Sequence, residues 1–400
     1  MNNNRNTVLI LGAFRFPTGD AAAARVMGVG RALRQAGYEV AFAGWEQSGR
    51  PEDREGNGRF SYEGFQYYSQ DEFRTGYLSP VRRLLRYLFA GSNTLKWLKS
   101  VNLGDVKAIV AYHGGSLFLL RLTLLCKLRR ITLIADCTEW YDSEGLVGGR
   151  FGVAHLDNEF RMRIVNRLIG RLIVISHFLE RYYASRFCRV VRVPPTIDLS
   201  ERKWPPVVEA SSHAALSFVY AGVPGKKDLL SSALYAIRLL RQEGVSINLN
   251  LLGPSRADLL ACVDGDAGLL DDLDGALIFH GRVAQELVPT VVAQSDFSIL
   301  LRPVKRVSAA GFSTKLVESL AAGVPVFANR TGDIDRYIKD GEEGILLDDT
   351  TAHSFVAGAR RVLAMSESDL MRMRMAARRC AEHSFVYSGY VEALADFFDR

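Results

Sequence analysis

Cysteine is scarce in this sequence and forms no motif. Five cysteines are scattered over 400 residues, with no C-x-x-C pair and no histidine at zinc-ligand spacing. This pattern argues against a disulfide-stapled secreted scaffold and against a structural zinc module. We expect reduced, mostly structural thiols, as in a cytosolic protein. The cysteines are Cys126, Cys137, Cys188, Cys262 and Cys380.

Long apolar runs are also missing. The first residues, MNNNRNTVLILG, contain no apolar stretch of signal-peptide length. The longest apolar region, SLFLLRLTLLCKL, is interrupted by Arg121 and Lys127, so it does not suit a bilayer span. We find no low-complexity tract and no fixed-period repeat. We therefore expect a cytoplasmic protein, and we leave open peripheral attachment at the inner face of the plasma membrane.

Several catalytic motifs are absent. No G-x-G-x-x-G follows the first strand, so a dinucleotide fingerprint is missing, and no G-x-S-x-G suggests a hydrolase nucleophile. D-G-D at 264–266 and D-I-D at 333–335 look like the metal-binding D-x-D of some transferases. Both lie in polar segments that flank helices, so we expect no metal site and no cofactor.

The bulk composition is that of a globular protein with two domains. Hydrophobic residues make up 48% and charged residues 24% of the chain, and 400 residues exceed one ordinary core. The net charge of +6 is a mild basic excess. It suits an anionic ligand, a phosphate-rich substrate or an anionic membrane surface. We expect no nucleic-acid partner.

Short apolar strands alternate with helical patterns along the chain, which is typical of parallel α/β sheets. Strands are predicted in the first half at 7–12, 38–44, 106–114, 131–136 and 171–176. A second series is predicted at 217–222, 246–253, 276–281, 296–301, 324–329 and 344–347. Residues 190–215 lack periodicity and contain four prolines, and their later part is a candidate linker.

This pattern predicts an α/β fold with two Rossmann-like domains facing a cleft. The first domain would span 1–200 and be rejoined by the C-terminal helix 385–400. The second would span 201–384. Ligands are expected at the carboxyl ends of the strands.

One loop–helix junction, AAGFSTKLVESLAAGVPVFAN (309–329), stands out. It follows a strand, and its helix is expected to begin near Ser313. The first N–H groups of such a helix suit a phosphate or sugar hydroxyls. Lys315 and Glu318 follow in the first turns, and the Glu318 carboxylate can accept two hydrogen bonds from a vicinal diol such as ribose.

Three further glycine loops leave strand ends. YAGVPGKKDLL (220–230) carries Lys226 and Lys227, either of which could neutralise a diphosphate. FHGRV (279–283) ends another strand. In the first half, AFRFPTGDAAAAR opens a helix for which Asp20 is a candidate N-cap.

Taken in order, "YAGVPGKKDLL…IFHGRV…DFSILLRP…GFSTKLVESLAAGVPVFAN" resembles the donor-nucleotide half of GT-B glycosyltransferases of family GT4. The opening loop and helix, with RLIVISHFLERYYASRF and VPPTID, resemble the acceptor half. The likeness covers nearly the whole chain, is strongest over 217–350, and is weak over 45–105. It implies a retaining, metal-independent enzyme that uses a nucleotide sugar, commonly in bacterial surface-polysaccharide assembly. A UDP- or GDP-sugar donor and a glycan or lipid-linked acceptor are favoured.

The resemblance also assigns roles to residues. Glu318 matches the second glutamate of the E-x7-E motif, which binds the donor ribose, and Lys226 or Lys227 matches the phosphate-binding lysine. Gly281 and Val283 fall where the base is contacted. The donor-sugar and diphosphate cradle and its flanks comprise Gly222, Arg302, Gly311, Phe312, Ser313, Thr314 and Lys315. The N-domain loop facing the acceptor contributes Thr18, Gly19 and Asp20.

The sequence departs from the family pattern at three places. Ala310 stands where the first motif glutamate is expected, and Val223 replaces an arginine. Arg302 and Lys305 are candidates to supply that charge. The usual histidine of the N-terminal domain is also missing.

Three residues are candidates for the catalytic role left open by the missing histidine. They are Asp136, Glu139 and, at an earlier strand end, His113.

Two other functions remain open at this point. One is a GT-B nucleotide-sugar epimerase, and the other is a catalytically silent nucleotide-sugar-binding protein, which Ala310 favours.

Residues 79–100 carry basic groups beside a broad apolar face. They could lie at a membrane interface or pack on the first domain.

Overall fold

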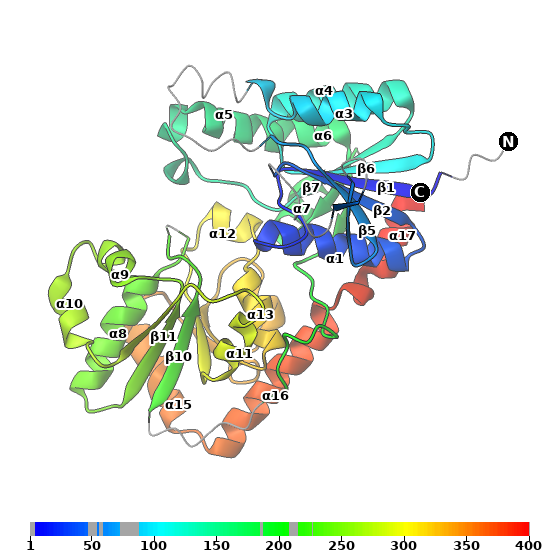
Figure 1. Cartoon of the computed structure of the whole chain (residues 1–400). Coiled ribbons are helices and arrows are strands. Elements are labelled where there is room, and N and C mark those ends of the chain that lie inside the picture. The colour runs from blue at the N-terminus through cyan, green and yellow to red at the C-terminus, as the bar shows by residue number, and fades with distance from the viewer. Residues whose placement is uncertain are drawn as a thin grey trace. The chain divides into compact units, whose positions relative to one another are not determined.

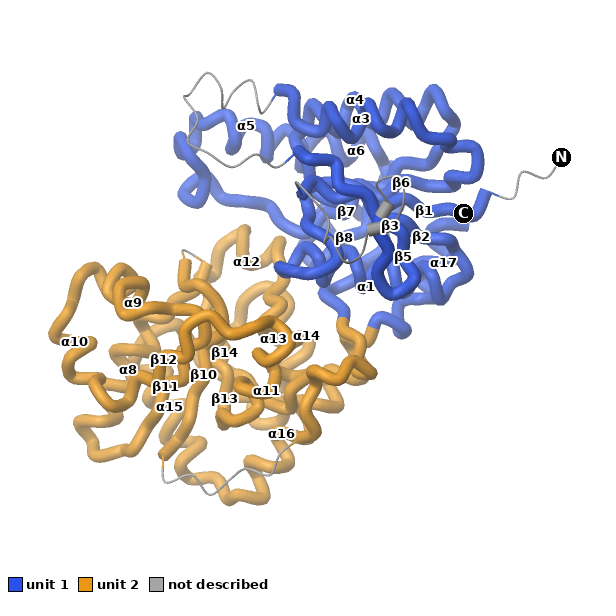
Figure 2. The backbone as a smooth tube through the Cα atoms, viewed as in Figure 1, with its two compact units in different colours: residues 1–196, 387–400 blue, residues 197–386 orange. Residues whose placement is uncertain are grey.

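Each apolar segment predicted to be a strand forms one in the computed structural model, within two residues at either end. The structure describes residues 5–46, 54–55, 59–72, 88–184, 187–207, 215–225 and 227–399. The chain divides into two units (Figure 2): unit 1, residues 1–196 with 387–400, and unit 2, residues 197–386. The sequence had suggested boundaries at 200/201 and 384/385. The acceptor- and donor-binding roles of the two domains stay predictions.

Among the described residues, unit 1 contains a nine-stranded sheet in the order β3-β4-β5-β2-β1-β6-β7-β8-β9. Its strands are β1 (Thr7–Gly12), β2 (Glu39–Gly44), β3 (Arg54–Glu55), β4 (Arg59–Tyr62), β5 (Phe65–Ser69), β6 (Val106–Tyr112), β7 (Thr132–Cys137), β8 (Arg171–Val174) and β9 (Arg189–Arg192). All neighbours from β5 to β9 pair in parallel, whereas β3, β4 and β5 pair antiparallel. Strands β3, β4, β5 and β9 were not predicted.

Helices cover both faces of this sheet (Figure 1). Helices α1 and α17 lie on one face, and α3, α4 and α6 lie on the other. The described helical segments are α1 (Ala21–Gln35), α3 (Ser92–Ser100), α4 (Ser116–Arg129), η3 (Ser143–Gly145), η4 (Gly149–Phe151), α5 (Val153–Phe160), the π-helical η5 (Arg161–Val165), α6 (Asn166–Ile169), α7 (His177–Tyr183), η6 (Tyr387–Tyr390) and α17 (Val391–Asp399).

Local chemistry explains where two of these helices begin. The Asp20 carboxylate accepts the Ala23 N–H at 2.9 Å, so Asp20 is confirmed as the N-cap of α1. The Ser176 hydroxyl similarly accepts the Leu179 N–H at 3.3 Å at the start of α7.

The chain returns to unit 1 at its end. Phe397 and Phe398 of α17 are buried against α1, and Lys107 forms an ion pair with Asp399 at 2.6 Å. The C-terminal residues therefore complete the core of a unit whose other residues lie almost 200 positions earlier.

Unit 2 contains, in its described part, a six-stranded parallel sheet in the order β12-β11-β10-β13-β14-β15. Its strands are β10 (Leu216–Ala221), β11 (Ile247–Leu252), β12 (Leu277–Gly281), β13 (Phe297–Leu300), β14 (Val326–Asn329) and β15 (Gly344–Leu347). This is the doubly wound order 3-2-1-4-5-6, whose direction of winding reverses between β10 and β13. Ligands of such sheets bind at that reversal, beyond the carboxyl ends of the strands.

Two helical layers enclose the unit 2 sheet. Helices α8 and α15 pack on one face around Phe218, Phe327 and Phe355, and α11, α13 and α16 pack on the other. The described helices are α8 (Leu230–Gln242), α9 (Arg256–Cys262), α10 (Ala267–Asp272), α11 (Val288–Ala293), α12 (Arg306–Ala310), α13 (Thr314–Ala321), α14 (Ile334–Tyr337), α15 (Ala352–Leu363) and α16 (Glu367–Ser384).

The amphipathic segment 79–100 is described only in its second part. There, Leu98 is buried and Leu95 and Trp97 pack on the core of unit 1, as expected for an ordinary helical flank. Residues 79–87 lie outside the described residues, so a membrane role for 79–100 stays a prediction. Across the described chain, no helix is both long enough and apolar enough to cross a bilayer.

A buried carboxyl group lies just beyond β2. Glu46 is 7% exposed, and neither of its carboxyl oxygens has a hydrogen-bond partner among the described residues. Burial disfavours the charged form and raises the pKa of Glu46 to about 8. The folded protein therefore holds this carboxyl as a neutral acid at pH 7.

Stability should depend on pH through Glu46. In the unfolded chain the pKa of Glu46 returns to about 4.5. Between pH 4.5 and about pH 8 the unfolded chain therefore binds fewer protons than the folded chain. The unfolding free energy should fall as pH rises through this window, by at most about 1.4 kcal/mol per pH unit. Glu46→Gln should remove that slope, whereas Glu39→Gln, at an exposed position of β2, should keep it.

The measurement is the midpoint of urea-induced unfolding at pH 5, 6.5 and 8, monitored by tryptophan fluorescence. Three of the four tryptophans, Trp45, Trp97 and Trp140, lie in unit 1, so the signal reports mainly on it. Equal pH slopes for wild type and Glu46→Gln would show that this carboxyl is not held neutral.

Candidate functional site

Three glycines end adjacent strands of unit 2 and bring their loops together. Gly222, Gly253 and Gly281 follow or end β10, β11 and β12, all with positive φ. The Gly222 N–H donates to Leu252 O at 2.8 Å, and the Gly253 N–H donates to Gly281 O at 2.7 Å. We did not predict Gly253 as a site residue, although its position as a glycine at the end of a strand could have indicated one.

Lys315, on the first turn of α13, ties that helix to the loop after β10. Its Nζ donates to Asp228 Oδ2 at 2.8 Å and to Tyr220 OH at 2.9 Å, and it lies 4.0 Å from the centre of the Tyr220 ring. Burial lowers the pKa of Lys315, while the charge of Asp228 opposes that shift. Gly222 has φ +129°, a backbone conformation that other residues rarely adopt, and a Cβ there would lie 2.9 Å from Lys315 Cε, so a larger residue would be strained and would have to displace the end of that side chain.

The predicted phosphate-binding lysines lie on this same loop. Lys226 is outside the described residues. The Lys227 carbonyl accepts a long hydrogen bond from Arg302 Nε at 3.5 Å, which links the loops after β10 and β13. Asn329 fixes the Arg302 backbone, since its side chain bonds both the Arg302 N–H at 2.8 Å and the Arg302 carbonyl at 2.9 Å.

The turn between α12 and α13 has an uncapped helix start. Gly311 is extended, and the Ser313 side chain makes no capping hydrogen bond to α13. The first N–H groups of the helix therefore lack a side-chain partner from Ser313 and are placed to bind an anion. Phe312 instead anchors the turn, packing edge-on to Tyr337 and Phe385 at 5.5 and 5.8 Å. Ala310, at the position of the absent glutamate, is fully buried.

Glu318 lies one turn further along α13 and is half-buried. No hydrogen bond to its carboxylate is present among the described residues. Burial raises the pKa of Glu318, and the nearby charges of Lys203 and Lys315 lower it. A carboxylate in this situation is available to accept hydrogen bonds from a bound molecule.

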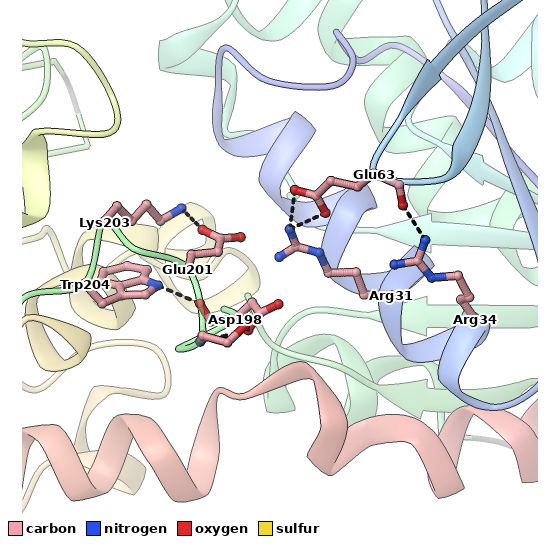
Figure 3. A network of polar contacts seen from close by, with 8 residues as sticks. Arg31, Arg34, Glu63, Asp198, Glu201, Lys203 and Trp204 are labelled. Atoms are coloured by element: carbon pink, nitrogen blue, oxygen red, sulfur yellow. Dashed lines mark hydrogen bonds and ion pairs between the residues drawn. The ribbon is translucent and has the colours of Figure 1, made fainter.

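Lys203 is a site residue that the sequence did not reveal. It lies in the linker, where Trp204 packs on Leu316 and Val317 of α13 and donates from Nε1 to Asp198 O at 2.8 Å. Lys203 pairs with Glu201 at 2.5 Å (Figure 3). The tryptophan in this proline-rich stretch could have indicated that the linker packs against unit 2.

Gly281 and Val283 are the two residues predicted to contact the base of the donor. Gly281 ends β12, and Val283 packs beside the small core formed by residues such as Val219 and Leu252.

No cluster of three metal-ligating side chains occurs in the described residues. In the two D-x-D segments, Asp266 caps α10 and Asp333 pairs with Arg336 at 3.7 Å. Metal independence itself stays a prediction.

In unit 1, Asp136 is part of a buried ion pair. Both of its carboxylate oxygens accept from Arg25, at 3.1 and 2.9 Å, and Arg25 also donates to the carbonyls of Val193 and Pro194. Both side chains are almost fully buried. This pairing ties α1 to β7 and to the segment after β9, and a catalytic role for Asp136 stays a prediction.

His113 is held from both ring nitrogens at the end of β6. Arg161 donates to Nδ1 at 3.0 Å, and since a guanidinium can only donate, Nδ1 is unprotonated. The ring is therefore neutral and donates from Nε2 to Thr138 Oγ1 at 2.6 Å.

Glu139 lies next to Thr138 and is half-buried. Thr18 and Gly19 lie in the turn before Asp20. Catalytic or acceptor-binding roles for these residues stay predictions.

Residues 214–365 match the sequence profile of the family described as glycosyl transferases group 1. Unit 2 carries a glycosyltransferase group 1 domain. The glycine loops, Lys315 and Glu318 all lie within that domain. No curated protein matches the sequence.

Solved structures resemble the whole chain. Sucrose-phosphate synthase from Thermosynechococcus elongatus is 16% identical with a TM-score of 0.72, covering 99% of this chain and 98% of its own. HepE from Anabaena, in complex with UDP and glucose, is 12% identical with a TM-score of 0.67, covering 98% and 99%. WaaG, a glycosyltransferase involved in lipopolysaccharide biosynthesis, is 13% identical with a TM-score of 0.63, covering 98% and 99%. These similarities confirm the predicted α/β class and the GT-B fold.

The Arg25–Asp136 pair should stabilise unit 1. Asp136→Ala would leave the Arg25 guanidinium buried without its countercharge, which typically costs about 3–5 kcal/mol. The double variant Arg25→Met/Asp136→Leu should cost less than the sum of the single changes, because no charge remains unpaired. Urea-induced unfolding, monitored by tryptophan fluorescence, measures the stability of the single and double variants. Unchanged stability of Asp136→Ala would contradict the stabilising role of the pair, and loss of activity without loss of stability would support the catalytic role predicted for Asp136.

Proposed function

We propose that this protein is a retaining glycosyltransferase that moves a sugar from a nucleotide-sugar donor to a glycan or lipid-linked acceptor. The observation that carries the proposal is the half-buried, unbonded Glu318 carboxylate on the first turns of α13. It follows an uncapped helix start at the winding reversal of a glycosyltransferase group 1 domain. HepE was solved with UDP and glucose, which supports a UDP-sugar, with GDP as the alternative.

Each part of this site suits one part of the donor. The Glu318 carboxylate can accept hydrogen bonds from both ribose hydroxyls. The N–H groups that begin α13, together with a lysine at 226 or 227 and Arg302, can bind the diphosphate. When the bond between the sugar's anomeric carbon and the phosphate oxygen breaks, negative charge grows on that oxygen. Fixed donors and cations stabilise that charge and so lower the barrier.

Lys315 has a different role in this proposal. Its ammonium is already bonded to Asp228 and Tyr220, so it holds the glycine loop against α13. It thereby positions the loop that carries Lys226 and Lys227.

The acceptor and the pathway are proposed from a structural neighbour. WaaG acts in lipopolysaccharide biosynthesis, which favours a role in bacterial cell-surface polysaccharide assembly. The buried Ala310 favours the competing proposal of a silent nucleotide-sugar-binding protein, because the glutamate that would touch the sugar is absent. Slow release of nucleoside diphosphate from candidate donors would indicate a transferase, whereas a binding protein would release none.

Nucleotide binding should depend on Glu318. Wild type should be stabilised by UDP, GDP or another diphosphate in a thermal-shift screen, by about 2.7 kcal/mol at 100 times the dissociation constant. Losing charge-assisted hydrogen bonds to ribose should weaken binding roughly 10- to 100-fold in Glu318→Ala. Glu367→Ala, at an exposed position of α16, is the matched control. Equal nucleotide affinity for Glu318→Ala and wild type would refute the ribose assignment.

Transfer should proceed without a divalent metal. The site offers backbone donors and cations for the diphosphate, so an added ion is not needed to neutralise it. Donor turnover, followed as nucleoside diphosphate release, should be unchanged within about twofold by excess EDTA. Loss of turnover on chelation with rescue by Mg²⁺ or Mn²⁺ would instead assign a metal role to one of the D-x-D segments.

A further inference from the structure

Strand β12 forms one edge of the unit 2 sheet. It pairs with β11 on one side (Figure 2), and no strand in the described part of the chain pairs with it on the other. Four of its five residues are exposed, and the apolar side chains of Ile278 and Phe279 are each 40% exposed. Such an edge presents unpaired backbone N–H and C=O groups, to which another strand can be added.

Two other edge strands of this protein are protected, whereas β12 is not. Strand β15, the opposite edge of the same sheet, is buried throughout. Strand β9, an edge of the unit 1 sheet, begins and ends with arginine and packs on α17. Strand β12 contains no lysine, arginine, carboxylate or proline. Natural sheets rarely leave an uncharged edge bare, which indicates that another strand covers β12.

The backbone of β12 determines which residues can bond to an added strand. The Leu249 N–H of β11 donates to Ala276 O at 2.8 Å. Successive residues of a strand turn their N–H and C=O groups to opposite sides. Ala276 and Ile278 therefore face β11, and Leu277 and Phe279 direct their bonding groups outward.

The charges before and after β12 have opposite signs. The charged or titratable residues that flank it or lie in it are Asp271, Asp272, Asp274, His280, Arg282 and Glu286. Asp271 and Asp272 already pair with arginines of unit 2, at 2.5 and 3.7 Å, and the histidine bonds an asparagine of β11 at 2.9 Å. Glu286 lies in the turn before α11. Asp274 and Arg282 are exposed, and neither side chain has an ion-pair partner among the described residues.

These features fit a second copy of the same strand. When two β12 strands run antiparallel with Ile278 opposite Ile278, Leu277 of each copy lies opposite Phe279 of the other. These are the two residues whose bonding groups point outward, so they can exchange backbone hydrogen bonds, and their apolar side chains pair across the strands. The same register places Asp274 of each copy opposite Arg282 of the other. The two unpaired charges thereby gain partners.

We infer that β12 is a dimerisation strand, which pairs antiparallel with β12 of a second copy of this chain. A two-fold axis through Ile278 would join two six-stranded sheets into one continuous sheet. This pairing uses the same edge on both copies, so it closes at a dimer. An unrelated peptide is disfavoured as the occupant, because it would need its own base near Asp274 and its own acid near Arg282. The inference stands whether or not the proposed transfer reaction is correct.

The test is the mass of the full chain in solution, measured by light scattering after gel filtration over a roughly hundredfold range of concentration. Wild type should be a dimer that dissociates on dilution. Ile278→Lys places two like charges at the two-fold axis and should raise the dimer dissociation constant at least roughly tenfold. Phe279→Pro removes an outward N–H but no bond to β11, and it should be monomeric. Leu363→Lys, at an exposed apolar position of α15, is the matched control and should dimerise like wild type.

Charge reversal tests the register. Asp274→Arg or Arg282→Glu alone should weaken dimerisation roughly three- to tenfold, because each change creates two like-charge contacts in the dimer. The double variant Asp274→Arg/Arg282→Glu restores both pairs with their signs exchanged and should dimerise like wild type. Glu367→Arg, at an exposed position of α16, is the matched control and should have no effect.

A disulfide gives a second readout of the register. Opposed residues in a non-hydrogen-bonded antiparallel pair have Cα atoms about 4.5 Å apart, which is within disulfide reach. Ile278→Cys should therefore form a covalent dimer on mild oxidation, whereas wild type and Leu363→Cys should not. Circular dichroism checks that each variant is folded.

Three results would overturn the inference. The first is a wild type that stays monomeric at every concentration. The second is a dimer that persists in both Ile278→Lys and Phe279→Pro. The third is a dimer in which the double charge reversal fails to restore what the single reversals lose, or in which Ile278→Cys forms no disulfide.

Discussion

A single ammonium group joins the parts of unit 2 that make up its candidate site. Lys315 extends from the first turn of α13 to Asp228 and Tyr220, across the line where the winding of the sheet reverses. Because Asp228 belongs to the loop after β10 and α13 follows β13, this contact sets how two loops from non-consecutive strands meet. Gly222, whose positive φ other residues rarely adopt, lies against the end of the Lys315 side chain. The uncapped helix start and Glu318 lie on the same helix as Lys315.

The regular part of the fold was predictable because its signals are local. Buried parallel strands are continuous apolar runs, and helix starts such as Asp20 carry their own capping chemistry. The glycine loops were predictable for the same reason, since each directly follows a strand. Resemblance to a known motif then singled out Glu318, whose unbonded carboxylate could not have been deduced from spacing alone.

Features that depend on distant partners were not predictable. The ion pair of Asp136 is one example, because its partner Arg25 lies 111 residues earlier in the chain. The charge of Lys203 acts on Glu318 from a linker that Trp204 packs against α13, and no local pattern marked this arrangement. Strands β3–β5 form an antiparallel edge with weak apolar alternation, and no local pattern marked them.

The return of α17 to unit 1 bears on how the protein is made. Phe397 and Phe398 cover α1, so this helix lacks part of its core until α17 has been translated. Translation of the intervening 190 residues of unit 2 takes on the order of 10–40 s in a cell. During that interval unit 2 can complete its own core, whereas unit 1 presents an unfilled apolar surface to chaperones. Loss of α17 would therefore damage unit 1 more than unit 2, although unit 2 directly precedes α17 in the chain.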